Sequence, residues 1–254
     1  MQTIDISFAI DQIPHILKGV PFTLLIALVS MAVSLLIGSV FAFIRLFRIP
    51  VLRQLVTLYV SFFRGTPLIV QLFAFFYGIP FVLTKMNSTF GLTFHPDMVS
   101  PLTVALITFS LHSAAHLTEV VRSALLAVDR GQLEAAKIVG MTTRQAMIRI
   151  ILPQAFVVAL PNLGNQLIQL LKATSLSFTI GVLEIMGISR IIANDGYKFL
   201  ETYLVSALIY WMLSIFFELA FALLEKRVSV YGKSLGHFFI LLFSVCYIVL
   251  SVLV

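Results

Sequence analysis

The amino-acid sequence predicts an all-α membrane protein, and three observations support this fold class. Hydrophobic residues make up 60% of the 254 residues, whereas Asp, Glu, Lys and Arg together make up only 11%. A soluble domain averages about 25% charged residues, so this chain has too few to build a polar shell around a core. The apolar residues gather in runs of about 20, the length that a helix needs to cross a bilayer. The basic residues gather in the short loops between these runs.

The apolar runs predict five membrane spans. They extend over Val20–Ile44, Leu55–Leu83, Pro101–Ala127, Pro153–Leu171 and Tyr203–Leu224. We expect the second run to be broken near Arg64-Gly65-Thr66-Pro67. Arg64 and Pro67 should lie near its cytoplasmic entry, with Pro67 in a first helical turn, where its missing N–H costs little. Polar residues predict a loop over 85–100 and less regular structure over 172–196.

Lys and Arg in the short loops predict how the spans are oriented, because cytoplasmic loops are enriched in these residues. The loops after the first, third and fifth spans are basic, whereas the two remaining loops have few Lys or Arg. The basic loops therefore face the cytoplasm. This places residues 1–19 outside the cell and the loop at 128–152 inside it. Residues 1–18 also lack the basic leader of a cleavable signal peptide.

Charge and cysteine content exclude other classes of function. The net charge is +6, but the basic residues follow one membrane face, so we expect no nucleic-acid partner. Cys246 is the single cysteine and lies in an apolar run, which excludes a disulfide framework. Gly232-Lys233-Ser234 is similar to the end of a phosphate-binding loop, but Arg227 stands where the first glycine of such a loop is required. We therefore expect no ATP site in this chain.

Residues 131–153 form the one long segment that is both helical in pattern and rich in charge. Gly140 interrupts the pattern. The hydroxyls of Thr142 and Thr143 can cap a second helix, because they accept hydrogen bonds from free backbone N–H groups. We predict two short helices with a bend at Gly140, lying against a membrane surface.

The spacing of this segment resembles the "EAA loop" of ATP-binding-cassette importer permeases. The matching residues are Glu134-Ala135-Ala136, Gly140 and Ile150-Ile151-Leu152-Pro153. In that family the loop forms a coupling helix that docks on a cytoplasmic ATPase. The resemblance implies that Glu134 is the main polar contact, that Ala135 and Ala136 permit close approach, and that Gly140 sets the turn.

Other motifs are similar to those of the polar-amino-acid branch of this family. They are RGTP at 64–67, GQLEAA at 131–136, LPQA at 152–155, LPNLGNQ at 160–166 and LKATSL at 171–176. Residues 172–181 look most like cystine-type permeases. The resemblance implies a type I importer transmembrane domain of five core helices over 20–228. The apolar run at 235–254 is then a tail or an extra helix.

The same resemblance implies the partners and the location. We expect a non-enzymatic permease in the plasma membrane of a prokaryote, in contact with membrane lipid. The expected partners are ATP-binding subunits, a second permease chain that is identical or related, and an extracytoplasmic amino-acid-binding protein. This chain would hold no cofactor, and ATP and Mg would bind to the partner ATPase.

Polar residues within the spans are candidates for the substrate path, because such groups are costly in a membrane unless they are paired or face water. The candidates are Glu119, Asn162, Asn165, Gln166, Thr174 and Ser175. Glu119 could instead form an ion pair with Arg122 on one helix face. The amides could instead bond neighbouring helices. A helix break near Thr174 would free backbone groups to line a cavity.

Two other classes of function remain as alternatives. An ion-coupled secondary transporter would need buried ionisable relays and internal repeats, and neither is evident in the sequence. An intramembrane metal-dependent enzyme could use the stripe of His112, His116 and Glu119 as metal ligands. Co-purification of an ATPase or of a metal ion would distinguish these alternatives from an importer.

Overall fold

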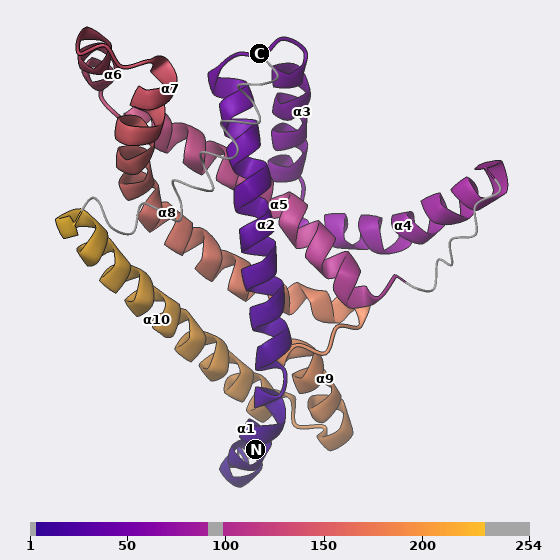
Figure 1. Cartoon of the computed structure of the whole chain (residues 1–254). Coiled ribbons are helices and arrows are strands. Elements are labelled where there is room, and N and C mark those ends of the chain that lie inside the picture. The colour runs from indigo at the N-terminus through magenta and orange to yellow at the C-terminus, as the bar shows by residue number, and fades with distance from the viewer. Residues whose placement is uncertain (1–3, 91–98, 232–254) are drawn as a thin grey trace. The chain divides into compact units, whose positions relative to one another are not determined.

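The computed structural model describes residues 4–90 and 99–231, and every regular element within these ranges is a helix (Figure 1). The elements are α1 (Ile6–Leu17), α2 (Val20–Leu46), α3 (Leu52–Gly65), α4 (Leu68–Phe90), α5 (Pro101–Ala127), α6 (Arg130–Ile138), α7 (Thr143–Ala146), the π-helix η2 (Met147–Ile151), α8 (Leu152–Ala173), the 3₁₀-helix η3 (Thr174–Ile180), α9 (Ile185–Gly196) and α10 (Phe199–Tyr231). The predicted tail at 235–254 lies outside the described residues.

Five stretches of the described chain are long and apolar enough to cross a membrane. They are Val20–Leu46, Leu68–Phe90, Pro101–Ala127, Thr143–Ile180 and Phe199–Val228. The predicted all-α class is therefore confirmed. The third span has the bounds that the sequence predicts, because Pro101 begins it at its first turn, where a proline is tolerated.

The break that the sequence predicts near Arg64-Gly65-Thr66-Pro67 is present, but it separates two helices, so Leu55–Leu83 is not one span. Two helices cover this region: α3 ends at Gly65, and α4 begins at Leu68. Pro67 explains the break, because it lacks an N–H and disfavours helical backbone at Thr66. Helix α4 also continues to Phe90, into the predicted loop. Polar residues such as Asn87 and Ser88 therefore lie within the helix and did not end it.

The chain clusters into two units. The first unit comprises Met1–Met31, Gly65–His112 and Leu167–Phe216, and the second comprises Ala32–Arg64, Ser113–Gln166 and the segment from Phe217 onward. The core of the first unit gathers fully buried side chains from α2, α4 and α5, among them Ile26, Leu72 and Phe109, together with residues from the end of α8 and from η3.

Helix α1 is a further part of the first unit, where the sequence predicts only an external segment. The side chain of Asp5 caps α1 by accepting a hydrogen bond from the backbone N–H of Phe8, and Asp5 also pairs with Lys198. Helix α1 contacts α9. Ile16 of α1 is fully buried in a cluster with Ile185 and Val205. The segment is therefore folded onto the unit rather than extended from it.

In the second unit, small residues allow two helices to approach closely. A Cβ atom added at Gly38 of α2 would lie 3.0 Å from the Cβ of Leu117 and 3.0 Å from the backbone N of Thr118 on α5. Ala114 and Ala115 on the same helix are fully buried. Close backbone approach through small residues is a common way for helices to pack in membranes.

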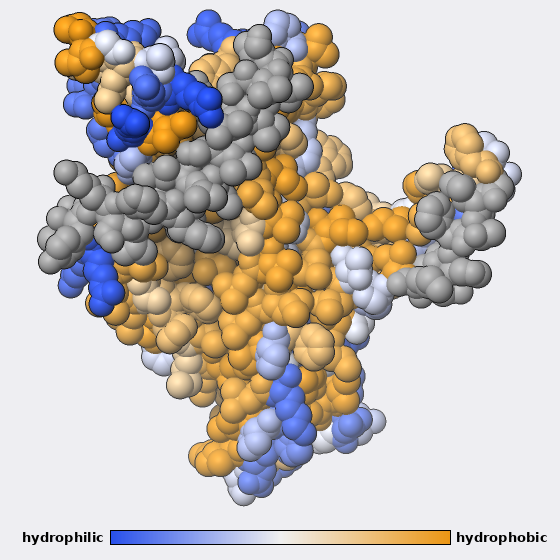
Figure 2. Space-filling model, viewed as in Figure 1, coloured by the Kyte–Doolittle hydropathy of each residue, from blue (hydrophilic) through white to orange (hydrophobic). Residues whose placement is uncertain are grey.

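The surface view separates apolar and polar parts of the molecule (Figure 2). In this view hydrophobic residues cover much of the long helices, whereas hydrophilic residues lie over α6 and α7 and also around α1. In the most apolar part of each of the α4 and α10 spans, only 11% of the residues are buried. These two helices therefore offer apolar surface to lipid or to partner subunits.

Candidate functional site

The segment from Asp129 to Ile151 has the shape that the sequence predicts. Helix α6 begins after Asp129, whose carboxylate accepts a hydrogen bond from the N–H of Gly131 at 2.6 Å, and ends near Val139. Gly140 follows with φ +81°. This left-handed backbone is open to glycine at no steric cost. The prediction of two short helices with a bend at Gly140 is therefore confirmed.

A capping box begins the second helix. The hydroxyl of Thr142 accepts a hydrogen bond from the N–H of Gln145 at 3.2 Å, and the Gln145 side chain accepts one from the N–H of Thr142 at 2.9 Å. Reciprocal bonds of this kind satisfy two backbone donors that the first turn leaves free. These two hydrogen bonds therefore fix the backbone of the turn, although the turn is exposed.

The four predicted coupling residues do not all lie on the surface. Glu134, Ala135 and Gly140 are exposed, and a Cβ added at Gly140 would meet nothing within 4 Å. Ala136 is only 2% exposed, so it packs inside the chain and cannot offer its methyl group to a partner. The expected contribution of Ala136 to close approach of a partner is therefore indirect.

Two exposed apolar residues at the same turn were not among the predicted coupling residues. Ile138 is 85% exposed and Val139 is 75% exposed. They lie at the C-terminal end of α6, next to Gly140 and one turn from Glu134. Large apolar side chains held in solvent beside charged ones are typical of a surface that a protein partner covers. Only the structure shows their exposure.

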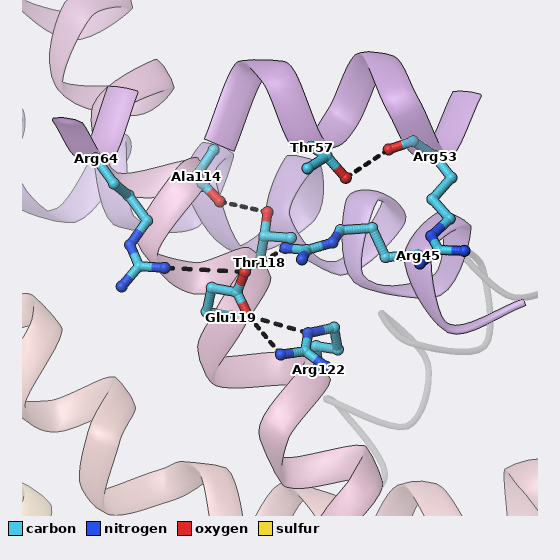
Figure 3. A network of polar contacts seen from close by, with 8 residues as sticks. All are labelled: Arg45, Arg53, Thr57, Arg64, Ala114, Thr118, Glu119 and Arg122. Carbon is cyan, nitrogen blue, oxygen red and sulfur yellow. Dashed lines mark hydrogen bonds and ion pairs between the residues drawn. The ribbon is translucent and has the colours of Figure 1, made fainter. Parts of the chain in front are cut away.

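The second cluster of interest surrounds Glu119 in the second unit (Figure 3). Three arginines from three helices approach its carboxylate: Arg45 from α2, Arg64 from α3 and Arg122 from α5. The Arg122 Nη2 atom lies 2.9 Å from Oε2, the Arg64 Nη1 atom lies 3.8 Å from Oε1, and Arg45 makes a direct hydrogen bond. The predicted ion pair between Glu119 and Arg122 is therefore present, but as one part of a larger network.

The network holds more positive than negative charge. One carboxylate cannot neutralise three guanidinium groups, and Arg64 has 48% of its side chain exposed. The sequence could not show this arrangement, because Arg45 and Arg64 lie far from Glu119 along the chain. Among the described residues, Glu119 on α5 is linked through these arginines to α2 and α3. Its role in the substrate path stays a prediction.

The remaining predicted path residues lie in both units. Asn162 and Asn165 are exposed on α8, and the Gln166 amide donates to the hydroxyl of Ser113 on α5 at 3.5 Å in the second unit. In the first unit, α8 changes to the 3₁₀-helix η3 at Thr174. The hydroxyls of Thr174 and Ser175 donate to backbone carbonyls three residues earlier, at 2.7 and 2.8 Å. The break in the α-helix is therefore compensated locally.

The alternative metal site receives no support from the described residues. No group of three or more His, Cys, Asp or Glu residues gathers in a geometry that could hold a metal ion within residues 4–90 and 99–231. The Nδ1 atom of His112 lies 3.0 Å from the side-chain oxygen of Gln71, so this ring already has a neutral hydrogen-bond partner.

Glu184 in the first unit was not predicted as a special residue. It is fully buried and caps α9, because its carboxylate accepts hydrogen bonds from the N–H groups of Met186 and Gly187 at 2.9 and 2.8 Å. The hydroxyl of Tyr210 on α10 donates to the same carboxylate at 2.5 Å. Burial raises the pKa of the Glu184 carboxyl from 4.5 to about 6. An acidic residue before a helical pattern is the only signal for this cap in the sequence.

Comparison with known proteins identifies the class of this multi-span helical membrane protein. The family described as "Binding-protein-dependent transport system inner membrane component" matches residues 34–230. The chain is 44% identical over 229 residues to the probable amino-acid permease protein YxeN of Bacillus subtilis, covering 90% of this chain and 98% of that one. It is 37% identical over 225 residues to the L-cystine transport system permease protein TcyL of the same organism, covering 89% and 92%.

Solved structures agree with this class. An amino acid ABC transporter, crystallised with histidines, superposes with a TM-score of 0.76 at 29% identity, covering 89% of this chain and 100% of that chain. The inward-facing MetNI methionine ABC transporter has the same fold, with a TM-score of 0.67 at 22% identity and coverage of 84% and 95%. The chain therefore belongs to the family of binding-protein-dependent transport system inner membrane components. It is a multi-pass permease of the plasma membrane.

Proposed function

We propose that this chain forms the translocation path of an ATP-driven importer for polar amino acids. The observation that carries the proposal is that relatives named as amino-acid and L-cystine permeases match the chain at 37–44% identity over most of its length. In the proposed complex, ATP-binding subunits supply the energy and hold ATP and Mg. An extracytoplasmic binding protein delivers the substrate. A second permease chain completes the path.

The turn from α6 to α7 is the proposed contact with the ATPase. Glu134, Ile138 and Val139 are exposed together on it. A carboxylate offers charge-assisted hydrogen bonds, and the two apolar side chains offer area to bury. The positive-inside orientation predicts that this turn faces the cytoplasm, where such a subunit is present.

The path from this turn into the membrane is short. Helix α6 contacts α7 and η2, and η2 continues directly into α8. The helical connection is continuous, so a push on the turn would be passed on to α8, and the π-helix η2 and Pro161 are the places where the connection can bend. Because α8 carries Asn162, Asn165 and Gln166, the movement would reach residues that we propose to line the substrate path.

Replacement of Glu134 tests the docking contact. Glu134→Ala should leave the membrane fold intact, because the side chain is exposed, and weaken ATPase association by roughly ten- to a hundred-fold through loss of a charge-assisted contact. Gln132→Ala on the same helix, also exposed but uncharged, is the matched control. ATPase co-purification and uptake into vesicles are the measurements. Normal association and uptake by Glu134→Ala would rule out the docking role of this residue.

Replacement of Gly140 tests the turn. Gly140→Val should also abolish coupling, but by distorting the loop, because a β-branched residue is strained at positive φ. Substrate class is tested by ATP hydrolysis of the reconstituted complex across a panel of amino acids. Failure of every polar amino acid to stimulate hydrolysis, with the binding protein present, would contradict the proposed substrate class.

A further inference from the structure

A basic groove lies beside the turn between α2 and α3 in the second unit. Its volume is about 640 Å³. The lining residues that can contact an anion or an apolar chain are Arg48, Arg53, Gln54, Thr57, Leu58 and Ser61. They combine two guanidinium groups, one amide, two hydroxyls and an exposed leucine. The proposed transport function uses none of these residues.

The two arginines of the groove differ from those around Glu119. Arg48 and Arg53 are exposed, and neither forms an ion pair with any described residue. The sequence contains no Asp or Glu between residues 12 and 96. Local neutralisation within this segment is therefore impossible, and Glu119 is already shared by three other arginines. The charge of the groove suits an anion from outside the chain.

Helix α3 adds apolar surface beside this charge. Val56, Val60 and Phe63 are buried against the unit. The other face leaves Leu55 and Leu58 exposed by 57% and 69%. A short helix with one face packed on protein and another apolar face exposed beside arginines is typical of a helix that lies at a membrane interface. The position agrees with this, because α3 begins six residues after the end of the first span at Leu46.

The backbone of the turn is strained at two places. Arg48 has φ 54° and Val51 has φ 65°, both in the left-handed region. This region is uncommon for non-glycine residues and unfavourable for a β-branched side chain such as Val51. Strained backbone concentrates at ligand-binding and switch segments, where the surroundings hold it. Here the two strained residues, Arg48 and Val51, both line the groove.

We propose that this groove binds the head group of an anionic phospholipid. Arg48 and Arg53 bind the phosphate, and Gln54 and Ser61 offer hydrogen bonds to the polar head-group atoms, whereas the Thr57 hydroxyl donates to the carbonyl of Arg53 at 2.7 Å. The acyl chains lie along Leu55 and Leu58. Anionic lipids of the cytoplasmic leaflet are the anions most concentrated at such a position, and basic residues next to membrane spans attract them. The exposed apolar face distinguishes a lipid from a soluble anion.

The test measures retention of phosphatidylglycerol by the purified importer complex in detergent, using native mass spectrometry. The variant Arg48→Gln/Arg53→Gln removes the charge of the groove but keeps side-chain length. The variant Lys226→Gln/Arg227→Gln is the matched control, because both residues are exposed near the end of α10 and neither lines the groove. Retention should fall at least five-fold in the groove variant and stay within two-fold of wild type in the control.

Two further measurements distinguish a bound lipid from a bound soluble anion. Inorganic phosphate at matched ionic strength should fail to displace the lipid, and Leu58→Ser should lower retention with both arginines in place. Equal retention by the groove variant and the wild type would overturn the proposal. So would displacement by inorganic phosphate, which would assign the site to a soluble anion. If the double variant does not assemble, Arg48→Gln alone is measured against Arg227→Gln, and unchanged retention is again a refutation.

Discussion

Glu119 and Glu184 are two acidic residues of this membrane protein that the fold satisfies in opposite ways. Glu119, with 22% of its side chain exposed, is surrounded by three guanidinium groups. Glu184 is fully buried and surrounded by neutral donors: two backbone N–H groups and the hydroxyl of Tyr210. The first is satisfied mainly by charge and the second by hydrogen-bond geometry.

The difference shows what each position can tolerate. A partly exposed ion pair is screened by water and salt, so much of its effect is orientation of the helices that supply the arginines. A buried carboxylate cannot rely on water, so the loss of any of its donors or of the acceptor itself leaves an unsatisfied group. The cap of α9 should therefore be more sensitive to substitution than the arginine network.

The largest expected effect is that of Glu184→Ala. This change leaves the N–H groups of Met186 and Gly187 and the hydroxyl of Tyr210 without their acceptor, which should destabilise the first unit by about 3 kcal/mol or more. Glu184→Gln is the control, because it keeps an oxygen acceptor and should lose less than half as much. The measurement is the apparent melting temperature of the purified complex. Equal losses in the two variants would show that hydrogen-bond geometry is not what matters at this position.

A smaller effect is expected for Glu119→Ala. Three arginines would then face one another without a carboxylate, and we expect a loss of about 2 kcal/mol, between the values for exposed and buried pairs. Because the repulsion is electrostatic, 1 M salt should recover part of the loss. A second change, Arg45→Ala, should also recover part of it. Salt-independent destabilisation, equal in the single and double variants, would contradict an electrostatic role for this network.

The stability of the protein should depend on pH through the carboxyl of Glu184. The pKa of Glu184 is raised from 4.5 to about 6 by burial, so between these values the folded chain holds more protons on this carboxyl than the unfolded chain does. Its contribution to stability is fully present below pH 4.5 and is lost as the pH rises through 6, by up to about 2 kcal/mol. Glu184→Gln should remove this dependence. An unchanged pH profile in that variant would refute the assignment to Glu184.

The smallest effect is expected within the arginine network itself. Arg64 lies 3.8 Å from Glu119 and is 48% exposed, whereas Arg45 is 20% exposed and bonds directly. Arg64→Gln should change stability by less than about 0.5 kcal/mol, as for most exposed ion pairs. Arg45→Gln should have the larger effect of the two. The comparison uses the same melting assay, and the reverse order would mean that Arg64 is the main partner of Glu119.

The sequence predicted much of the fold and part of the site for identifiable reasons. The length of the apolar runs predicted most of the spans, and Gly140 with the Thr142-Thr143 pair predicted the bend in the exposed segment. Both are local properties of the chain. The break between α3 and α4 was predicted near Arg64-Gly65-Thr66-Pro67, but the helices on its two sides were counted as one span, because hydropathy is averaged over many residues.

Of the three arginines around Glu119, only Arg122 was predicted as its partner. Residues three positions apart on a helix lie on one face, so this pair can be recognised in the sequence. Arg45 and Arg64 reach the same carboxylate through the packing of α2 and α3 with α5, which no local pattern contains. The cap at Glu184 was missed for the same reason. Its backbone partners are local, but its bond to Tyr210 and its complete burial depend on how α9 and α10 pack.

The sequence by itself determined that this protein lies in a membrane, that it is helical, how many spans it has and which segment resembles a coupling loop. Those features follow from composition, run length and local capping, which act over one or two helical turns. Only the tertiary structure decided which charges meet, that Ala136 is buried while Ile138 and Val139 are exposed, and that Arg48 and Arg53 line a groove without an acidic partner among the residues that the structure describes. Burial and charge pairing are properties of surfaces brought together by packing, and residues far apart in the chain supply them.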